Sequence, residues 1–181
     1  CAVNVSVTIT ESLINTSYSQ TNVSCFGGSD GSVDITISGG ATGSAPGDTN
    51  YILELFGVQL PILYPQQTFS TSSIPPPYNA VSAGIYPFSI TDLNGCTIHD
   101  TVIITQPPLL TVTDSIIIPS CIWCSDGSAS VYPSGGSPGY TYLWSDGQTN
   151  QIATSLSSGT YTCEITDING CTVIDTIIIS S

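Results

Sequence analysis

Cysteine is the residue type in this chain with the clearest capacity for chemistry, because seven cysteines occur among 181 residues. Several of them lie in segments that occur twice. The segment Cys25–Ser32 recurs as Cys121–Ser128, and the segment Thr91–Thr97 recurs as Thr166–Thr172. Self-similarity of this kind is typical of repeat proteins, which are more often scaffolds than catalysts. In such a chain, cysteines at matching positions indicate disulfides and an oxidising, extracellular setting.

Comparison of the two copies predicts how the cysteines pair. Cys25 and Cys96 of the first copy correspond to Cys121 and Cys171 of the second. We therefore expect one bridge within each copy, joining the start of its second strand to the start of its last strand. Cys1 is left without a partner.

The second copy has two further cysteines. Cys124 and Cys163 stand where the first copy has Gly28 and Phe88, so both appear together and are absent together. A second bridge requires this pattern, and we expect Cys124 to pair with Cys163.

A zinc site is the alternative for Cys121, Cys124, Cys163 and Cys171. Zinc ligands usually come as two close pairs, but Cys163 and Cys171 are eight residues apart, and the first copy lacks two of the four ligands. The pattern favours disulfides, and we expect no metal of this kind.

His99 is the only histidine, so a Ser-His-Asp or Cys-His arrangement has one candidate base. It lies in a predicted strand whose counterpart in the second copy has Ile174 at the matching position. A structural histidine is therefore expected, and we predict neither an enzyme nor an organic cofactor.

Acidic and amide side chains recur at the predicted turns, as Asp92 and Asn94 in the first copy and as Asp167 and Asn169 in the second. Oxygen-rich loops of this kind can bind calcium. Asp and Asn are also the residues that turn geometry favours. Calcium is therefore the one ion that the sequence leaves open.

Asp100 and Asp175 share the alternation of the apolar residues in their strands. This parity predicts a bulge, a satisfied buried carboxylate, or a site that faces a neighbouring unit.

The charge is one-sided: 13 acidic residues, no lysine and no arginine give a net charge of -13. Nucleic-acid binding is excluded, because its affinity comes from basic side chains that displace counterions. Anionic membrane surfaces are disfavoured for the same reason, and no run of about 18 apolar residues could span a membrane. The chain shows neither a signal peptide nor an initiating methionine, so we expect a mature or excised segment.

Alternating apolar residues predict β-strands as the elements that position these groups. Examples are Val33, Ile35 and Ile37 in the first copy and Tyr161, Cys163 and Ile165 in the second. Asn94-Gly95 and Asn169-Gly170 suit tight turns between strands, because both residue types tolerate positive φ. No segment has the period of a helix.

The copies also predict the domains. Residues 1–10 match the last strand of a preceding copy, residues 11–107 form the first domain, and residues 108–181 form the second. The offset between the copies is 96 at their first cysteines and 75 at their last, so the first domain carries 21 extra residues. We place this insertion at about 41–83.

Aromatic side chains could recognise sugars or proteins. In the insertion, Phe56, Tyr64 and Tyr78 form the expected recognition loop. In the second domain, Trp123 and Tyr132 are further candidates. Trp144 is expected to pack in the core beside Tyr161, whose place two residues before Cys163 suits a tyrosine corner.

Together these motifs resemble the SprB-type repeat of very large Bacteroidota surface adhesins associated with gliding motility. The second copy matches this pattern along nearly its whole length, and the first copy matches at its ends but departs from Ala41 to Ala83. The matching residues of the second copy are Cys121, Gly127, Ser128, Gly135, Gly136, Tyr140, Tyr142, Trp144, Ser145, Gly147, Leu156, Gly159, Tyr161 and Thr166 to Cys171.

The resemblance implies an all-β chain of tandem immunoglobulin-like antiparallel sandwiches, secreted by the type IX system and displayed outside the outer membrane. The O-glycosylation signal of that phylum resembles Asp, then Ser or Thr, then an apolar residue. It marks Thr101, Ser115 and Thr176.

We therefore expect a structural stalk or filament segment of a secreted cell-surface adhesin, acting in adhesion and gliding-type motility. Its partners would be neighbouring repeats of the same chain or filament, and surface glycans or other cells. One alternative is a glycan- or partner-binding module that uses the insertion. Another is a polymerising subunit whose strand Cys1–Thr10 docks on the next chain.

Overall fold

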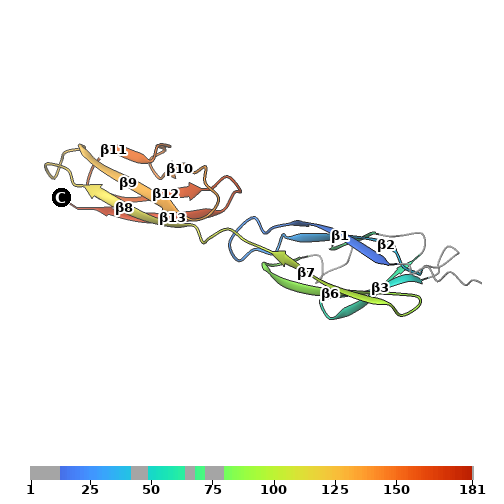
Figure 1. Cartoon of the computed structure of the whole chain (residues 1–181). Coiled ribbons are helices and arrows are strands. Elements are labelled where there is room, and N and C mark those ends of the chain that lie inside the picture. The colour runs from blue at the N-terminus through green and yellow to red at the C-terminus, as the bar shows by residue number, and fades with distance from the viewer. Residues whose placement is uncertain (1–12, 42–48, 64–67, 72–79, 181) are drawn as a thin grey trace, which may run out of the picture. The chain divides into compact units, whose positions relative to one another are not determined.

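A computed structural model describes residues 13–41, 49–63, 68–71 and 80–180 of the chain. Within these ranges the chain folds into antiparallel strands, and none of the described residues is in an α-helix (Figure 1). The chain divides into two compact units. Unit 1 comprises residues 1–22 and 29–104, and unit 2 comprises residues 23–28 and 105–181.

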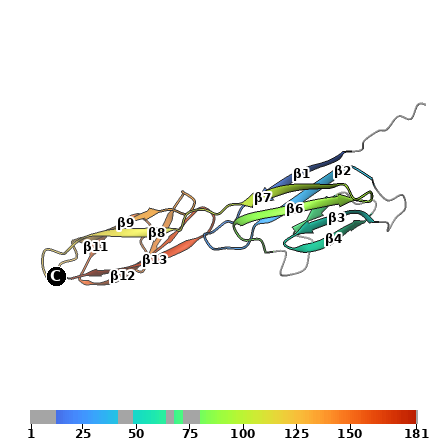
Figure 2. The ribbon, with the colours of Figure 1, turned by 60° about the horizontal axis from the view of Figure 1, so that its bottom comes forward.

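Unit 1 consists of two sheets. The first has the order β1-β2-β5. The second has the order β4-β3-β6-β7, and its strands are labelled in Figure 2. The strands are β1 (Ile14–Thr21), β2 (Ser32–Gly39), β3 (Thr49–Leu55), β4 (Val58–Leu63), β5 (Thr68–Ser70), β6 (Gly84–Asp92) and β7 (Thr97–Ile104). In the lettering of immunoglobulin domains this order is A-B-E against C′-C-F-G, which is an immunoglobulin-like sandwich.

Unit 2 repeats this plan with one strand fewer. Its sheets have the orders β11-β9-β8 and β10-β12-β13, which correspond to A-B-E and C-F-G. The strands are β8 (Thr111–Ile117), β9 (Gly127–Ser134), β10 (Thr141–Trp144), β11 (Ile152–Leu156), β12 (Gly159–Thr166) and β13 (Thr172–Ile179). The predicted all-β, immunoglobulin-like fold class is confirmed.

The cores arise from the period-two alternation. In β2 the side chains of Val33, Ile35 and Ile37 are fully buried while their neighbours face solvent. Trp144 anchors the core of unit 2, where Tyr161 packs against the same cluster, as predicted. The indole N–H of Trp144 donates to the carbonyl oxygen of Asn150 at 2.8 Å, so this large side chain is buried without an unsatisfied donor.

The insertion in unit 1 is partly strand. It supplies β4, which pairs with β3 through a tight turn at Phe56 and Gly57, where both residues have positive φ. As a result the C′-C-F-G sheet of unit 1 has four strands, whereas the matching sheet of unit 2 has three.

A tyrosine corner occurs in both units. The hydroxyl of Tyr86 donates to the carbonyl oxygen of Ser82 at 2.9 Å, and that of Tyr161 donates to Ser157 at 3.3 Å. Each bond ties the start of the F strand to the chain four residues upstream.

The turn between the F and G strands is built around a carboxylate in both units. We call Asp92–Cys96 the first Asp turn and Asp167–Cys171 the second Asp turn. In the second, Asp167 Oδ1 accepts the backbone N–H groups of Asn169 and Cys171, each at 2.9 Å, and Oδ2 accepts that of Ser137 at 2.8 Å. In the first, Asp92 accepts the matching N–H groups of Asn94, Cys96 and Ala41, each at 2.9 Å.

A pair of glycines makes room for each carboxylate. Gly135 and Gly136 both have positive φ, and a Cβ on Gly136 would lie 2.7 Å from Asp167 Oδ2. A Cβ on Gly135 would overlap the carbonyl oxygen of Leu109. Gly39 and Gly40 have the same conformation in unit 1. The repeated Gly-Gly and Thr-Asp-x-Asn-Gly-Cys segments are therefore two halves of one structural motif.

Asp100 and Asp175 have the parity of the buried residues in their strands, but neither strand bulges, since both registers run without a shift. Asp100 is exposed. Asp175 is half-buried, and within the described part of the chain its Oδ2 is buried without a hydrogen-bond partner. The predicted bulge is therefore wrong, and Asp175 is only partly satisfied.

Asp175 lies directly opposite Cys163, which is fully buried in the core of unit 2 as a free thiol. Burial raises the pKa of the Cys163 thiol to about 11; a hydrogen bond from the Leu143 backbone opposes this effect, and the Asp175 charge adds to it. The thiol is therefore protonated and unreactive in the folded chain.

Replacement of Asp167 by asparagine is expected to destabilise unit 2. Burial opposes ionisation of this carboxyl, but the N–H groups of Ser137, Cys171 and Asn169 outweigh it and hold its pKa below the ordinary 3.8. An amide loses the charge that strengthens these bonds, so the melting temperature at pH 7 should fall by roughly 5 °C. The measurement is thermal unfolding followed by circular dichroism.

The effect of Asp167→Asn on stability should depend on pH. Because the pKa of Asp167 is lower in the folded chain, the ionised carboxylate stabilises the fold at pH values above 3.8. This stabilisation is lost as the pH falls through the pKa of the folded chain. Wild type and Asp167→Asn should therefore converge near pH 2. Asp114→Asn, at an exposed position of β8, is the matched control and should melt like wild type at both pH values. Equal melting of Asp167→Asn and wild type at pH 7 would contradict the role of the carboxylate.

Alkylation should distinguish Cys163 from Cys96. At neutral pH iodoacetamide is expected to modify the exposed thiol of Cys96 and to leave Cys163 unmodified until denaturant is added. Peptide mass mapping of the native and denatured protein measures this. Modification of Cys163 at the rate of Cys96 in the native chain would show that its strand opens readily.

Candidate functional site

The second Asp turn carries a disulfide to a distant part of the sequence. Cys171 is bonded to Cys25, with an S–S distance of 2.03 Å, a Cα–Cα distance of 5.7 Å and a sequence separation of 146 residues. Cys25 belongs to the loop between β1 and β2, which we call the first cysteine loop (Val23–Gly28). This loop is part of unit 2, although the strands on either side of it are part of unit 1.

Hydrogen bonds hold the first cysteine loop in unit 2. The backbone N–H of Val23 donates to the carbonyl oxygen of Thr105 at 2.9 Å, and that of Gly27 donates to Gln106 Oε1 at 2.7 Å. Asn169 Nδ2 donates to the carbonyl oxygen of Ser24 at 3.1 Å. The side chain of Val23 is buried, so the loop is held by packing as well as by the disulfide.

The predicted bridges Cys25–Cys96 and Cys121–Cys171 are wrong, because Cys25 is bonded to Cys171 and Cys121 to Cys124. The physical reason is that the loop after the A strand and the Asp turn adjoin opposite ends of a sandwich. The loop after the A strand ends at Gly31, which pairs with Val81 just before β6 begins. The Asp turn follows the other end of β6, a strand of 9 residues. At about 3.3 Å per residue these ends are roughly 25 Å apart, whereas the Cα atoms of a disulfide lie within about 7 Å.

The predicted bridge between Cys124 and Cys163 is also wrong. Cys124 is bonded to Cys121, three residues away in the sequence, with a Cα–Cα distance of 5.0 Å. Both lie in the loop between β8 and β9, which we call the second cysteine loop (residues 119–124). Because these two sulfurs are joined to each other and Cys163 is in the core, the alternative zinc site is not formed either.

Cys96 is the other free thiol among the described residues, and it is exposed in the first Asp turn. It occupies the position that Cys171 has in the second Asp turn. Cys1 and the strand Cys1–Thr10 lie outside the described residues.

The calcium candidates have structural roles. The Asp92 and Asp167 carboxylates accept backbone N–H groups, and the Asn169 side chain bonds Ser24 and Ser137. Within the described ranges no group of three or more His, Cys, Asp or Glu side chains gathers around a potential metal position. Calcium binding stays a prediction.

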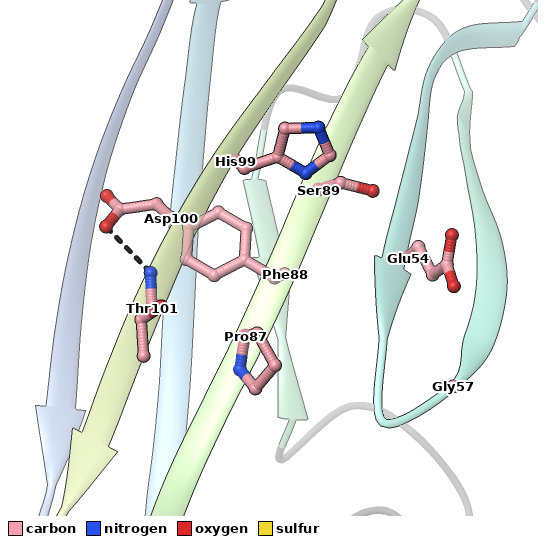
Figure 3. A pocket seen from close by; sticks show the side chains of 8 residues that line it. All are labelled: Glu54, Gly57, Pro87, Phe88, Ser89, His99, Asp100 and Thr101. Carbon is pink, nitrogen blue, oxygen red and sulfur yellow. Dashed lines mark hydrogen bonds between the residues drawn. The ribbon is translucent and has the colours of Figure 1, made fainter.

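An open pocket of about 530 Å³ lies over β3, β6 and β7 of unit 1. Figure 3 shows the side chains that line it: Glu54, Gly57, Pro87, Phe88, Ser89, His99, Asp100 and Thr101. Strand register places Glu54 opposite Ser89 and Ser89 opposite His99, so these three side chains form a row across the sheet. His99 is exposed.

The predicted recognition loop is described only in part. Phe56 packs edge-on against Tyr86, with ring centroids 5.1 Å apart. Tyr64 and Tyr78 lie outside the described residues. In unit 2, Trp123 is 90% exposed and Tyr132 50%, so both remain available for contacts.

The three candidate glycosylation residues, Thr101, Ser115 and Thr176, are exposed. Thr101 and Thr176 each donate a backbone N–H to the preceding aspartate, at 2.7 and 2.9 Å respectively. Exposure is necessary for modification, which stays a prediction.

In the described residues no helix is long and apolar enough to cross a membrane. No curated protein sequence matches the chain. The model of one family, the SprB repeat, matches at residues 17–46 and again at residues 119–149.

Solved structures with a similar fold include the three N-terminal domains of the highly immunogenic outer capsid protein (Hoc) of bacteriophage RB49. The identity is 16% and the TM-score 0.47, over 92% of this chain and 59% of that chain. The 282-residue C-terminal fragment of intimin, solved with the intimin-binding domain of its translocated receptor, matches at 14% identity and a TM-score of 0.46, over 97% of this chain and 65% of that one. The amphioxus IgVJ-C2 molecule matches at 14% identity and a TM-score of 0.30, over 85% of this chain and 98% of that one.

The chain thus spans less than two thirds of the first two of these structures. Its fold class follows from the strand order of each unit. The first match covers most of β1, the first cysteine loop and β2, and the second covers the second cysteine loop, β9 and β10. The SprB repeat model thus matches the chain at two places, which is consistent with a SprB-type repeat.

Proposed function

We propose that this chain is a stalk or filament segment of a secreted cell-surface adhesin. The two matches to the SprB repeat and the tandem immunoglobulin-like units support this role. Disulfides support an extracellular location, because they persist in oxidising compartments. Type IX secretion, attachment at the outer membrane and gliding-type motility are part of the same proposal.

The observation that carries the proposal is the bridge between Cys25 and Cys171. It is a covalent bond between the first SprB match and the second Asp turn, 146 residues apart. A load applied to the two ends of the chain therefore passes through this bond and bypasses the residues it encloses. An adhesin stalk requires this property, because it must transmit force without unfolding.

The composition fits a crowded surface array. With no lysine or arginine, the net charge of -13 gives neighbouring chains a repulsive field and a well-solvated surface. Trypsin-like proteases also have no basic residue at which to cut.

We propose no catalysis and no cofactor. The one histidine does not lie between a serine and an acid: the order across the sheet is Glu54, Ser89, His99, with the serine in the middle. A Ser-His-Asp mechanism requires the histidine to contact both of the other groups.

A binding module is the second candidate function, and the pocket of unit 1 favours it. The carboxylate of Glu54, the hydroxyl of Ser89 and the imidazole of His99 offer hydrogen-bonding groups that suit sugar hydroxyls. The insertion contributes Glu54 and Gly57 to this pocket, and unit 2 has no β4 counterpart.

Single-molecule pulling from the two ends of the chain tests the stalk role. With the Cys25–Cys171 bridge intact, the enclosed residues cannot extend. Reduction, or the variant Cys25→Ser, should release the 146-residue separation, which is roughly 500 Å of contour length. A matched control is the double variant Cys121→Ser with Cys124→Ser, which should leave the length of the oxidised chain nearly unchanged because that bridge spans three residues. Full extension of the oxidised wild-type chain would contradict the proposal.

Glycan-array binding tests the second candidate. If the pocket recognises sugars, Glu54→Ala and His99→Ala should each reduce the signal by at least roughly tenfold, since each removes a hydrogen bond from the site. Asp34→Ala, at an exposed position of the other sheet, is the control and should bind like wild type. Absence of binding by the wild-type protein would count against a glycan module.

A further inference from the structure

We propose that two copies of this chain join covalently through Cys121 of one and Cys96 of the other. The second cysteine loop of one copy docks on the first Asp turn of the next, and the disulfide forms by exchange with the Cys121–Cys124 bridge. The inference extends the proposed stalk role to the contact between copies, but it depends only on the chemistry of these cysteines.

Unit 2 provides the structural template for this contact. There the first cysteine loop bonds its Cys25 to Cys171, and the Ser24 carbonyl accepts the Asn169 side chain. A hollow of about 330 Å³ borders the disulfide and is lined by Cys25, Phe26, Pro108, Leu109, Leu110, Gly136, Gly170, Cys171 and Thr172. The accepting surface is thus an Asp turn together with the residues that precede the A strand.

The first Asp turn presents the same groups. Gly95 N–H donates to Asp92 O at 3.0 Å, as Gly170 does to Asp167. Leu93 N–H donates to Ala41 O at 3.2 Å, as Ile168 does to Ser137 at 3.3 Å. Its carboxylate accepts the same three backbone N–H groups. This shared geometry sets Asn94 and Cys96 in the positions of Asn169 and Cys171.

Among the residues that the structure describes, Cys96 has no disulfide partner, unlike Cys171. Its thiol is free and its side chain is exposed, as is that of Asn94. The residues beside the turn are also accessible, since Leu13 is 69% exposed and corresponds to Leu109 of the template surface. Within the described part of the chain, no cysteine loop is bonded to the first Asp turn, which therefore offers an accepting surface.

The second cysteine loop is the matching donor. Cys124 N–H donates to Cys121 O at 2.9 Å, as Gly28 N–H does to Cys25 O at 3.0 Å. Pro119 is buried at the base of the loop, where the first loop has Val23. The apolar side chains of Ile122 and Trp123 are 63% and 90% exposed. Exposed apolar side chains beside this disulfide fit a protein partner.

The exchange needs no oxidant. The Cys96 thiolate of one copy attacks Cys121 Sγ of the other, an S–S bond forms between them, and the Cys121–Cys124 bond breaks. Cys124 leaves as a thiolate and takes up the proton that Cys96 has lost. One disulfide is consumed and one is formed, so the electrons balance.

The contact joins two different surfaces, and each copy carries both. Such a head-to-tail contact generates open chains unless its rotation closes a ring. Repulsion between copies of charge -13 opposes the encounter, so added salt should accelerate the exchange by screening.

The test is oligomer formation by the purified full chain without added oxidant. All proteins carry Cys1→Ser, so that the thiol of Cys1 cannot react. When the protein is incubated at high concentration in added salt, non-reducing electrophoresis should show a ladder of covalent oligomers. Reductant should convert this ladder to monomer. Peptide mapping should find Cys96 linked to Cys121, and Cys124 as a free thiol.

Four variants identify the reacting atoms. Cys96→Ser and Cys121→Ser should each lose the ladder. Cys163→Ser removes the buried thiol, and this variant should still form the ladder. Cys124→Ser leaves Cys121 as a thiol, so the ladder should be lost in the absence of oxidant and restored by oxidised glutathione. Circular dichroism checks that each variant is folded, and a variant that fails this check is replaced by alkylation of Cys96 on the folded wild-type background.

Three results would overturn the proposal: wild-type protein that stays monomeric, a ladder linked only through Cys96 to Cys96, or a Cys96–Cys121 bond within a monomer. None of them bears on the stalk role. That role is decided by the release of length on reducing Cys25–Cys171, which is a different bond.

Discussion

The carboxylate of Asp167, and that of Asp92 in the first unit, organises the end of each sandwich that carries the chemistry. Each accepts three backbone N–H groups, two from its own turn and one from the segment that follows the glycine pair after the B strand. A loop of this kind would otherwise leave several buried donors unpaired, which is costly. The carboxylate therefore links the F–G turn to the B–C connection and sets the position of the cysteine that closes the turn.

The direction of the strands then determines what that cysteine can reach. In an immunoglobulin-like sandwich the loop after the A strand and the turn after the F strand lie at opposite ends. The two cysteines of one repeat are therefore separated by the length of the F strand, and neither can bond the other. In consequence the first cysteine loop bonds the second Asp turn, the second cysteine loop is closed by its own bridge, and Cys96 is a free thiol.

The absence of lysine and arginine restricts how the chain can be stabilised. Among its side chains only His99 could pair with an acid, so stability comes from apolar cores, backbone ladders, aspartate-capped turns and disulfides. Acidic groups are used where backbone N–H groups can satisfy them, and this use agrees with the lowered pKa values of Asp92 and Asp167. For Asp92 the Ala41 N–H is the main cause of this lowering, burial opposes it, and the Cys96 and Asn94 N–H groups add to it.

The repeat, the strands, the core position of Trp144 and the tyrosine corner could be predicted from the sequence, because each depends on local alternation or on motifs within one copy. The immunoglobulin-like class came from the resemblance of those motifs to the SprB-type repeat. The partners of the cysteines could not be predicted in this way and follow from the three-dimensional fold. Matching Cys25 to Cys121 and Cys96 to Cys171 shows which positions are equivalent, but equivalence carries no information about distance. Distance depends on which end of the sandwich each loop occupies, and strand pairing sets that. The same limit applies to Asp92 and Asp167, whose spacing suits either calcium or a turn until the N–H groups around them are placed.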